Sequence, residues 1–123
     1  MLFEEVTREI IGAAMEVHRT LGPGFVESIY RNALTHELRS RGLTVETELE
    51  VRIAYKSLTV GRHRLDLLVQ NSVIVELKAA SSIVEPHIAQ AFSYMKATGM
   101  KVSLVVNFGT TSLTWKRLVK SRN

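Results

Sequence analysis

The apolar residues at the start of the chain recur at intervals of three and four, which is the spacing of one face of an amphipathic helix. A first helix is predicted to begin near Phe3 and to end at Gly22-Pro23-Gly24. Its apolar face consists of Val6, Ile10, Ala13, Val17 and Leu21. A second helix is predicted from about Val26 to Ser40, with Gly42 in the position of a C-cap glycine.

The period of the pattern changes to two from Leu43 onward, which indicates a strand. Residues 43–53 form a long, half-exposed strand in this prediction, because apolar positions alternate with Thr44, Glu46, Glu48, Glu50 and Arg52. A turn near Lys56-Ser57 then leads into a second hairpin, between Arg62 and Lys78, that looks buried.

The rest of the chain predicts one helix between two further strands. Glu85-Pro86-His87 opens the helix, with proline at a tolerated early position, and Gly99 closes it. Residues 101–108 form a buried strand, and the helical crossover before it makes it parallel to the second strand of the hairpin. Residues 113–119 form the last strand. The predicted order is α, α, β, β, β, α, β, β, a mixed-sheet α/β fold in a single domain over residues 1–123.

Two stripes run along the helix that follows Pro86. His87, Gln90 and Tyr94 form a polar stripe, and Ile88, Phe92 and Met95 form an apolar one. One stripe is expected to face the core, which leaves the other free to face a site.

Composition restricts the classes of protein to consider. The 123 residues are 46% hydrophobic and 23% charged, as in an ordinary globular domain, and the chain has no cysteine. Disulfides and cysteine-based zinc sites are therefore excluded, and we expect a cytoplasmic protein. The acidic N-terminus and the lack of a long apolar run argue against a signal peptide and a membrane partner.

The net charge of +4 is distributed unevenly along the chain. Residues 1–50 hold nine acidic side chains against five Lys/Arg, and residues 51–123 hold three against eleven, so the two parts carry −4 and +8. A basic half of this kind can attract a polyanion such as nucleic acid. Its only acids are Asp66, Glu76 and Glu85, and two of them lie in the predicted buried hairpin.

Asp66, Glu76 and Lys78 need a common explanation, because a buried charge normally pairs, neutralises or binds a metal. Glu76 and Lys78 share a strand face by alternation. If residues 70–72 form a three-residue loop, Val69 pairs with Val73 and Asp66 lies opposite Glu76. A two-residue loop would turn Asp66 to the other face.

Two converging carboxylates suit a hard cation such as Mg²⁺, with Mn²⁺ as the alternative ion. The backbone carbonyl of Leu77 can supply a third oxygen. Lys78 beside the cation is then a candidate to orient or deprotonate an attacking water and to balance phosphate charge. A plain carboxylate–lysine salt bridge on a polar strand face explains the same spacing and stays open at this point.

Several linked segments resemble the GxxExxY protein family of the PD-(D/E)XK nuclease-like superfamily. The naming motif is Gly24-Phe-Val-Glu27-Ser-Ile-Tyr30, and the other segments are Arg64-Leu-Asp66, Val75-Glu76-Leu-Lys78-Ala, His87-Ile-Ala-Gln90 and Asn107-Phe-Gly109. The resemblance implies a restriction-endonuclease-like α-β-β-β-α-β core with an extra N-terminal helix and a C-terminal strand. It also implies that Asp66 and Glu76 bind metal, that Lys78 is catalytic, that Glu27 is an additional acidic residue with a ligand role at the metal, and that Gln90 adds a polar group to the site.

The function predicted from these residues is Mg²⁺-dependent hydrolysis of DNA or RNA phosphodiester bonds by a metal-activated water. A catalytically silent module of the same fold, which binds nucleic acid or a protein in a repair or defence assembly, is the main alternative. A phosphohydrolase of small molecules is a third. Because so small a chain offers little surface to a long duplex, we also expect a homodimer or a subunit of a larger complex.

Overall fold

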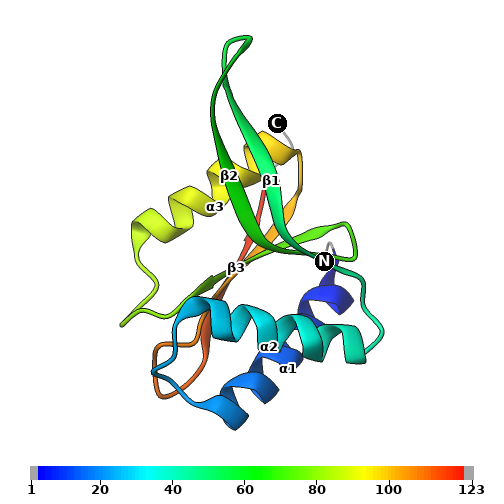
Figure 1. Ribbon diagram of the computed structural model, residues 1–123, viewed down its shortest axis with the longest axis vertical. Coiled ribbons are helices and arrows are strands. Elements are labelled where there is room, and N and C mark those ends of the chain that lie inside the picture. The colour runs from blue at the N-terminus through cyan, green and yellow to red at the C-terminus, as the bar shows by residue number, and fades with distance from the viewer. Residues whose placement is uncertain (1–2, 121–123) are drawn as a thin grey trace.

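The computed structural model describes residues 3–120, which form three helices and five strands (Figure 1). In chain order they are α1 (Glu4–Leu21), α2 (Glu27–Ser40), β1 (Val45–Tyr55), β2 (Leu58–Val69), β3 (Val73–Lys78), α3 (Glu85–Thr98), β4 (Val102–Asn107) and β5 (Thr114–Val119). This is the predicted order, and the predicted mixed α/β fold class is confirmed. None of the helices within the described range is long and apolar enough to cross a membrane.

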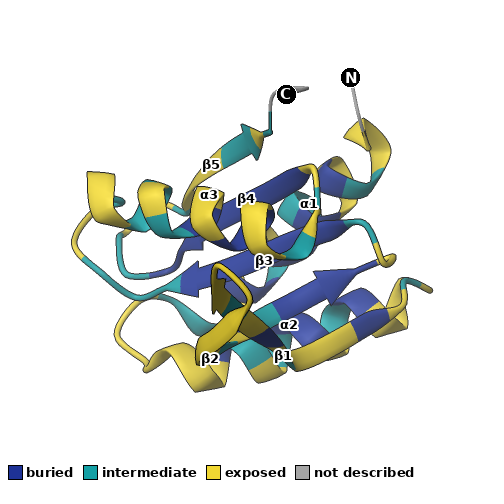
Figure 2. Ribbon diagram, turned by 90° about the horizontal axis from the view of Figure 1, so that it is seen from above, coloured by how far each residue is buried: buried dark blue, intermediate teal, exposed yellow. Residues whose placement is uncertain are grey.

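The five strands form one sheet in the order β1-β2-β3-β4-β5. Only β3 and β4 are parallel, as the helical crossover requires, and the other neighbours are antiparallel. Helices α1 and α2 cover one face with the larger apolar cluster, and α3 covers the other with a smaller cluster that includes Tyr94 and Met95. The central strands are consequently the most buried part of the molecule (Figure 2).

The strands β1 and β2 are about twice as long as the others and project beyond the helices (Figure 1). The predicted turn at Lys56-Ser57 is present, and Lys56 has a left-handed φ of 55°. Our prediction that the hairpin from Arg62 to Lys78 is buried holds only near its loop, since Arg62 and Arg64 are exposed. Alternation alone could not show that β2 extends past its partner β3.

Helix α3 is rotated relative to our expectation for its two stripes. Phe92 of the predicted apolar stripe is 42% exposed, whereas Tyr94 of the polar stripe is buried. Small Ala91 allows close approach to the sheet, and Tyr94 and Met95 fill the space beside it. The sheet therefore selects a face that contains the residues at i, i+3 and i+4 from Ala91, and Phe92 falls outside it.

Tyr30, the last residue of the GxxExxY motif, holds the loop between α1 and α2. Its ring is fully buried and stacks on Phe108, with the ring centroids 4.6 Å apart. Its hydroxyl donates a hydrogen bond to the Gly22 carbonyl at 2.5 Å and accepts one from the Phe25 amide at 3.2 Å. The tyrosine is therefore part of the scaffold that positions the start of α2.

We predict that Tyr30→Phe lowers the free energy of unfolding by about 1–3 kcal/mol, because it leaves the loop's polar groups without their partner and keeps the ring stacking. Urea denaturation measures this loss. Tyr55→Phe is the matched control, since Tyr55 is exposed at the end of β1 and its hydroxyl should contribute less than about 0.5 kcal/mol. Equal effects of the two substitutions would contradict the assignment.

Candidate metal centre and catalytic site

The β2–β3 loop has the register that a carboxylate site requires. Val69 pairs with Val73, and Gln70-Asn71-Ser72 forms the three-residue loop between them. Gln70 and Asn71 both have φ near +50°, and the Ser72 amide bonds to the Val69 carbonyl at 3.0 Å. The longer of the two predicted loops is thus confirmed.

Regular pairing of β2 with β3 ends one step before the two carboxylates, at Leu67 and Val75. Past this pair, side-chain carboxylates instead of backbone carbonyls accept the hydrogen bonds of the strand amides. The Leu77 amide donates to Asp66 Oδ2 at 2.9 Å, and the Asp66 amide donates to Glu76 Oε1 at 3.4 Å. Each acidic side chain therefore accepts a hydrogen bond from the backbone of the opposite strand.

Strand β2 is irregular at this point. Leu65 and Leu67 pack into different apolar clusters, although residues two apart on a regular strand share a face. The pairing with β1 also skips Asp66, and the residue it skips in β1, Glu48, has a φ of 52°. The irregularity lets Asp66 reach Glu76 without a standard antiparallel pair.

Glu76 is a buried acid in an unfavourable electrostatic setting. Its residue is only 4% exposed, and burial followed by repulsion from Asp66 raises the pKa of its carboxyl to about 8. The Asp66 amide and the Lys78 ammonium act in the opposite direction and do not cancel the shift. A carboxylate in this position is stabilised by any cation that reaches it.

Asp66 is held from the α2 side of the sheet by an arginine. Arg31 Nη1 lies 3.5 Å from Asp66 Oδ1, and Arg31 Nη2 lies 3.8 Å from Glu48 Oε1. Arg64 completes the chain of charges at 3.7 Å from Glu48 Oε2. Alternating charges therefore connect Asp66 to the projecting part of β2.

Lys78 and Gln90 meet on the α3 side, as the site prediction requires. Lys78 Nζ donates to Gln90 Oε1 at 3.2 Å, so α3 fixes the end of the lysine side chain. Tyr94 follows on the same face of α3, and burial, with a smaller contribution from the Glu76 charge, raises the pKa of its phenol. His87 does not join them, because its Nδ1 accepts the Val84 amide at 3.2 Å and so caps α3.

His63 is a site neighbour that sequence reasoning missed. Its ring stacks on Tyr94 with 4.0 Å between centroids, and its buried Nε2 has no hydrogen-bond partner. Burial lowers the pKa of the imidazole. The Asp66 charge raises this pKa and the Lys78 charge lowers it, and the net shift is downward. Its place two residues from buried Leu65, on the same side of β2, was the signal that could have revealed it.

Glu27 remains outside the cluster that the structure brings together. It lies exposed in the first turn of α2, and residues 3–120 contain no group of three or more His, Cys, Asp or Glu side chains able to hold a metal ion. Asp66 and Glu76 are therefore the two acidic side chains that the described structure brings together. The favourable interaction of an acid with the helix N-terminus explains the position of Glu27 without a metal.

Comparison with known proteins identifies a family and a similar fold. The family model described as "PD-(D/E)XK nuclease superfamily" matches residues 4–118, which include all five predicted site residues. The crystal structure of SSO0001 superposes with a TM-score of 0.56 at 17% sequence identity, over 78% of this chain and 50% of that one, so our chain spans half its length. That similarity concerns the fold alone. A search of curated proteins finds no match.

We predict that the metal-free protein loses stability, relative to its Glu76→Gln variant, as the pH rises from 5 to 9. The folded-state pKa of about 8 exceeds the ordinary 4.5, so the folded state keeps a proton that the unfolded chain releases, and the free energy of unfolding falls with pH. The expected relative loss is on the order of 2–4 kcal/mol. Urea denaturation in EDTA at pH 5 and pH 9 measures it.

Glu46→Gln, at an exposed position of β1, is the control: it keeps Glu76, so its free energy of unfolding should differ from that of wild type by the same amount at pH 5 and at pH 9. A difference between wild type and Glu76→Gln that is constant with pH would show that Glu76 ionises normally in the folded protein.

Proposed function

The chain belongs to the PD-(D/E)XK nuclease superfamily, and from this premise we propose that it is a divalent-metal-dependent nuclease that hydrolyses phosphodiester bonds. The observation that carries the proposal is the pair formed by Asp66 and Glu76, whose carboxylates converge where the β2–β3 ladder stops. A salt bridge with lysine does not account for this arrangement. Lys78 bonds to Gln90, and Glu76 is buried beside Asp66, so that burial and then the Asp66 charge raise the pKa of Glu76.

The donor set fits a hard cation. Asp66, Glu76 and the carbonyl of Leu77 offer oxygen ligands, and Mg²⁺ usually keeps several waters rather than demanding an all-protein cage. The high pKa of Glu76 supports this assignment, because burial and then the Asp66 charge disfavour its ionised form, which a bound cation would favour. When bound there, Mg²⁺ or Mn²⁺ supplies Lewis acidity toward the phosphate and acidifies a coordinated water.

The protein's own groups place the reactants. In hydrolysis the water oxygen bonds to phosphorus, one P–O ester bond breaks, the water loses a proton and the leaving oxygen gains one. Lys78 orients the attacking water and offsets phosphate charge, and Gln90 holds its ammonium in place. The apolar wall from β3 and α3 restricts bulk water, which strengthens these interactions.

Glu27 and Tyr30 lead us to place the chain within the GxxExxY family of this superfamily. In this proposal Tyr30 is structural and Glu27 acts from outside the carboxylate pair. The N-terminus of α2, where Glu27 lies, is positioned by the loop that Tyr30 holds.

We predict that Glu76→Gln and Asp66→Asn each lower metal-dependent cleavage at least 100-fold, because each removes a charged ligand. Lys78→Ala should have a similar effect on the rate with little change in metal binding. The assay is cleavage of single-stranded, duplex, flap and junction substrates with Mg²⁺ or Mn²⁺, together with calorimetric titration of the metal. Glu85→Gln, an exposed acid at the start of α3, is the control and should retain activity.

Full activity of purified, folded Glu76→Gln would overturn the proposal. If the wild type cleaves none of these substrates but binds them with a strong salt dependence, the chain is a silent nuclease-fold module. Hydrolysis of nucleotides without cleavage of polymers would instead identify a small-molecule phosphohydrolase.

Glu27→Gln is predicted to lower cleavage no more than tenfold, since no described contact brings Glu27 to the pair. Steady-state kinetics on the best substrate, beside Glu76→Gln, tests this ranking. A loss equal to that of Glu76→Gln would show that Glu27 moves into the metal's coordination sphere when substrate binds.

A further inference from the structure

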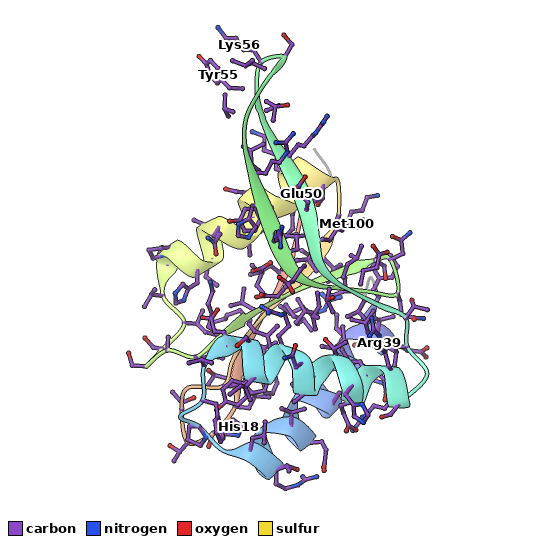
Figure 3. All side chains as sticks on the ribbon, viewed as in Figure 1. His18, Arg39, Glu50, Tyr55, Lys56 and Met100 are labelled. Carbon is purple, nitrogen blue, oxygen red and sulfur yellow. The ribbon has the colours of Figure 1, made fainter. Side chains whose placement is uncertain are left out.

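The outer part of the β1–β2 hairpin, residues 51–65, forms an arm that leaves the body of the protein. From Leu58 to Leu65, β1 is the only strand that β2 pairs with, since β3 pairs with β2 from Leu67 onward. All eight residues from 54 to 61 are exposed, and they form the tip of the arm. Figure 3 shows Glu50 where the arm leaves the body, with Tyr55 and Lys56 at its far end.

The charge of the arm has one sign. Its four charged residues are Arg52, Lys56, Arg62 and Arg64, and it contains no acid. Arg52 lies directly opposite Arg62 in the antiparallel pair, an arrangement that destabilises a ribbon. The nearest acids are at its base, where Glu50 lies 3.4 Å from Arg62 in an exposed, weak ion pair.

The three arginines share one face of the arm. Arg52 continues the alternation of Glu50, and Glu50 pairs across the ribbon with Arg64. The opposite face carries Val51 and Ile53, which belong to the cluster packed against α3. The arm is thus supported on its apolar face and presents its arginines to solvent.

The tip combines this charge with large apolar side chains. Tyr55, Leu58 and Val60 are 62%, 67% and 57% exposed, and Lys56 Nζ lies 5.3 Å from the centre of the Tyr55 ring. A two-stranded ribbon with an exposed apolar end is only marginally stable alone, which favours a bound partner. A second copy meeting tip to tip would bring like charges together, so the charge favours a polyanion.

We propose that the arm binds duplex DNA, with its arginines on the phosphates and its tip in the major groove. This inference rests on the proposed function, because it names the substrate class of the same site. The charges from Arg64 through Glu48 and Arg31 connect the arginine face of the arm to Asp66, which is one of the two carboxylates of the proposed site.

Duplex DNA fits the shape of the arm better than duplex RNA does. The major groove of B-form DNA is about 12 Å wide and admits a two-stranded β-ribbon. The major groove of A-form RNA is deep and too narrow for such an element. Arginine at the groove wall binds phosphate in two-pronged geometry, and apolar tip residues can contact thymine methyl groups.

The test measures binding in the Glu76→Gln background, with EDTA, so that cleavage cannot interfere. The probes are a 20-base-pair DNA duplex, an RNA duplex of the same sequence and single-stranded DNA, each followed by fluorescence anisotropy at several salt concentrations. The double substitution Arg52→Ala/Arg62→Ala is expected to weaken binding to duplex DNA at least tenfold. It should also reduce the slope of log K against log salt by about 2.

Arg8→Ala/Arg19→Ala is the matched control. Both residues are exposed arginines of α1, so the control removes the same charge from another surface and should change affinity less than twofold. Tyr55→Ser/Leu58→Ser should weaken duplex DNA binding without changing the salt slope. Circular dichroism verifies that each variant is folded.

Three results would overturn the inference: equal losses in the arm variant and the α1 control, RNA duplex binding as tight as that of DNA, or tip variants that change the oligomeric state and leave DNA binding intact. Hydrolysis of the p-nitrophenyl ester of thymidine 5′-monophosphate distinguishes the two proposals. If the otherwise wild-type arm variant keeps this activity and also binds DNA normally, the arm inference alone fails. If the wild type lacks it and all cleavage, the proposed function fails, and the binding data still decide the role of the arm.

Discussion

The arrangement of this molecule depends on a break in the β2–β3 ladder, where Asp66 and Glu76 accept hydrogen bonds from the backbone of each other's strands. A sheet normally satisfies these amides with carbonyls. Using carboxylates instead keeps the amides paired and draws two negative charges into a buried position, at the electrostatic cost visible in the raised pKa of Glu76. The site is therefore built from groups that stabilise the fold locally and oppose it electrostatically.

The same break determines where β2 goes. The residues of β2 that precede Leu67 have β1 but not β3 as a paired neighbour, so this outer part of the strand leaves the sheet as a two-stranded ribbon with β1. If the ladder continued through Asp66, this part of β2 would pair with β3, and the amides of Asp66 and Leu77 would bond to backbone carbonyls instead of carboxylates. The carboxylate pair and the arm are thus two consequences of one irregularity, and a chain of charges connects the arm to Asp66.

Much of this could be predicted from sequence, and the failures have physical causes. The loop register stayed open between a two-residue and a three-residue loop, because alternation shows which residues of one strand share a face and not how two strands align; the structure has the three-residue loop. The meeting of Lys78 and Gln90 came from the family resemblance and not from spacing, since nothing local relates β3 to α3. Phe92 was wrongly expected to share a stripe with Met95, because periodicity defines the faces of a helix and the sheet decides which one is covered. His63 was missed because nothing in the sequence separates it from a solvated surface residue, and its contact with Tyr94 arises only when α3 packs on β2.

Glu27 and Tyr30 show how differently two residues of one motif can be constrained. Tyr30 is fixed by a stacked ring and two backbone hydrogen bonds, so its purpose is visible in the scaffold alone. Glu27 is exposed, and the favourable interaction of its carboxylate with the N-terminus of α2 is enough to explain its position. A motif that joins them at three-residue spacing puts both on one side of α2. The tyrosine then serves to hold the start of that helix, and with it the acid, at a constant place relative to β2 and β3, where Asp66 and Glu76 meet.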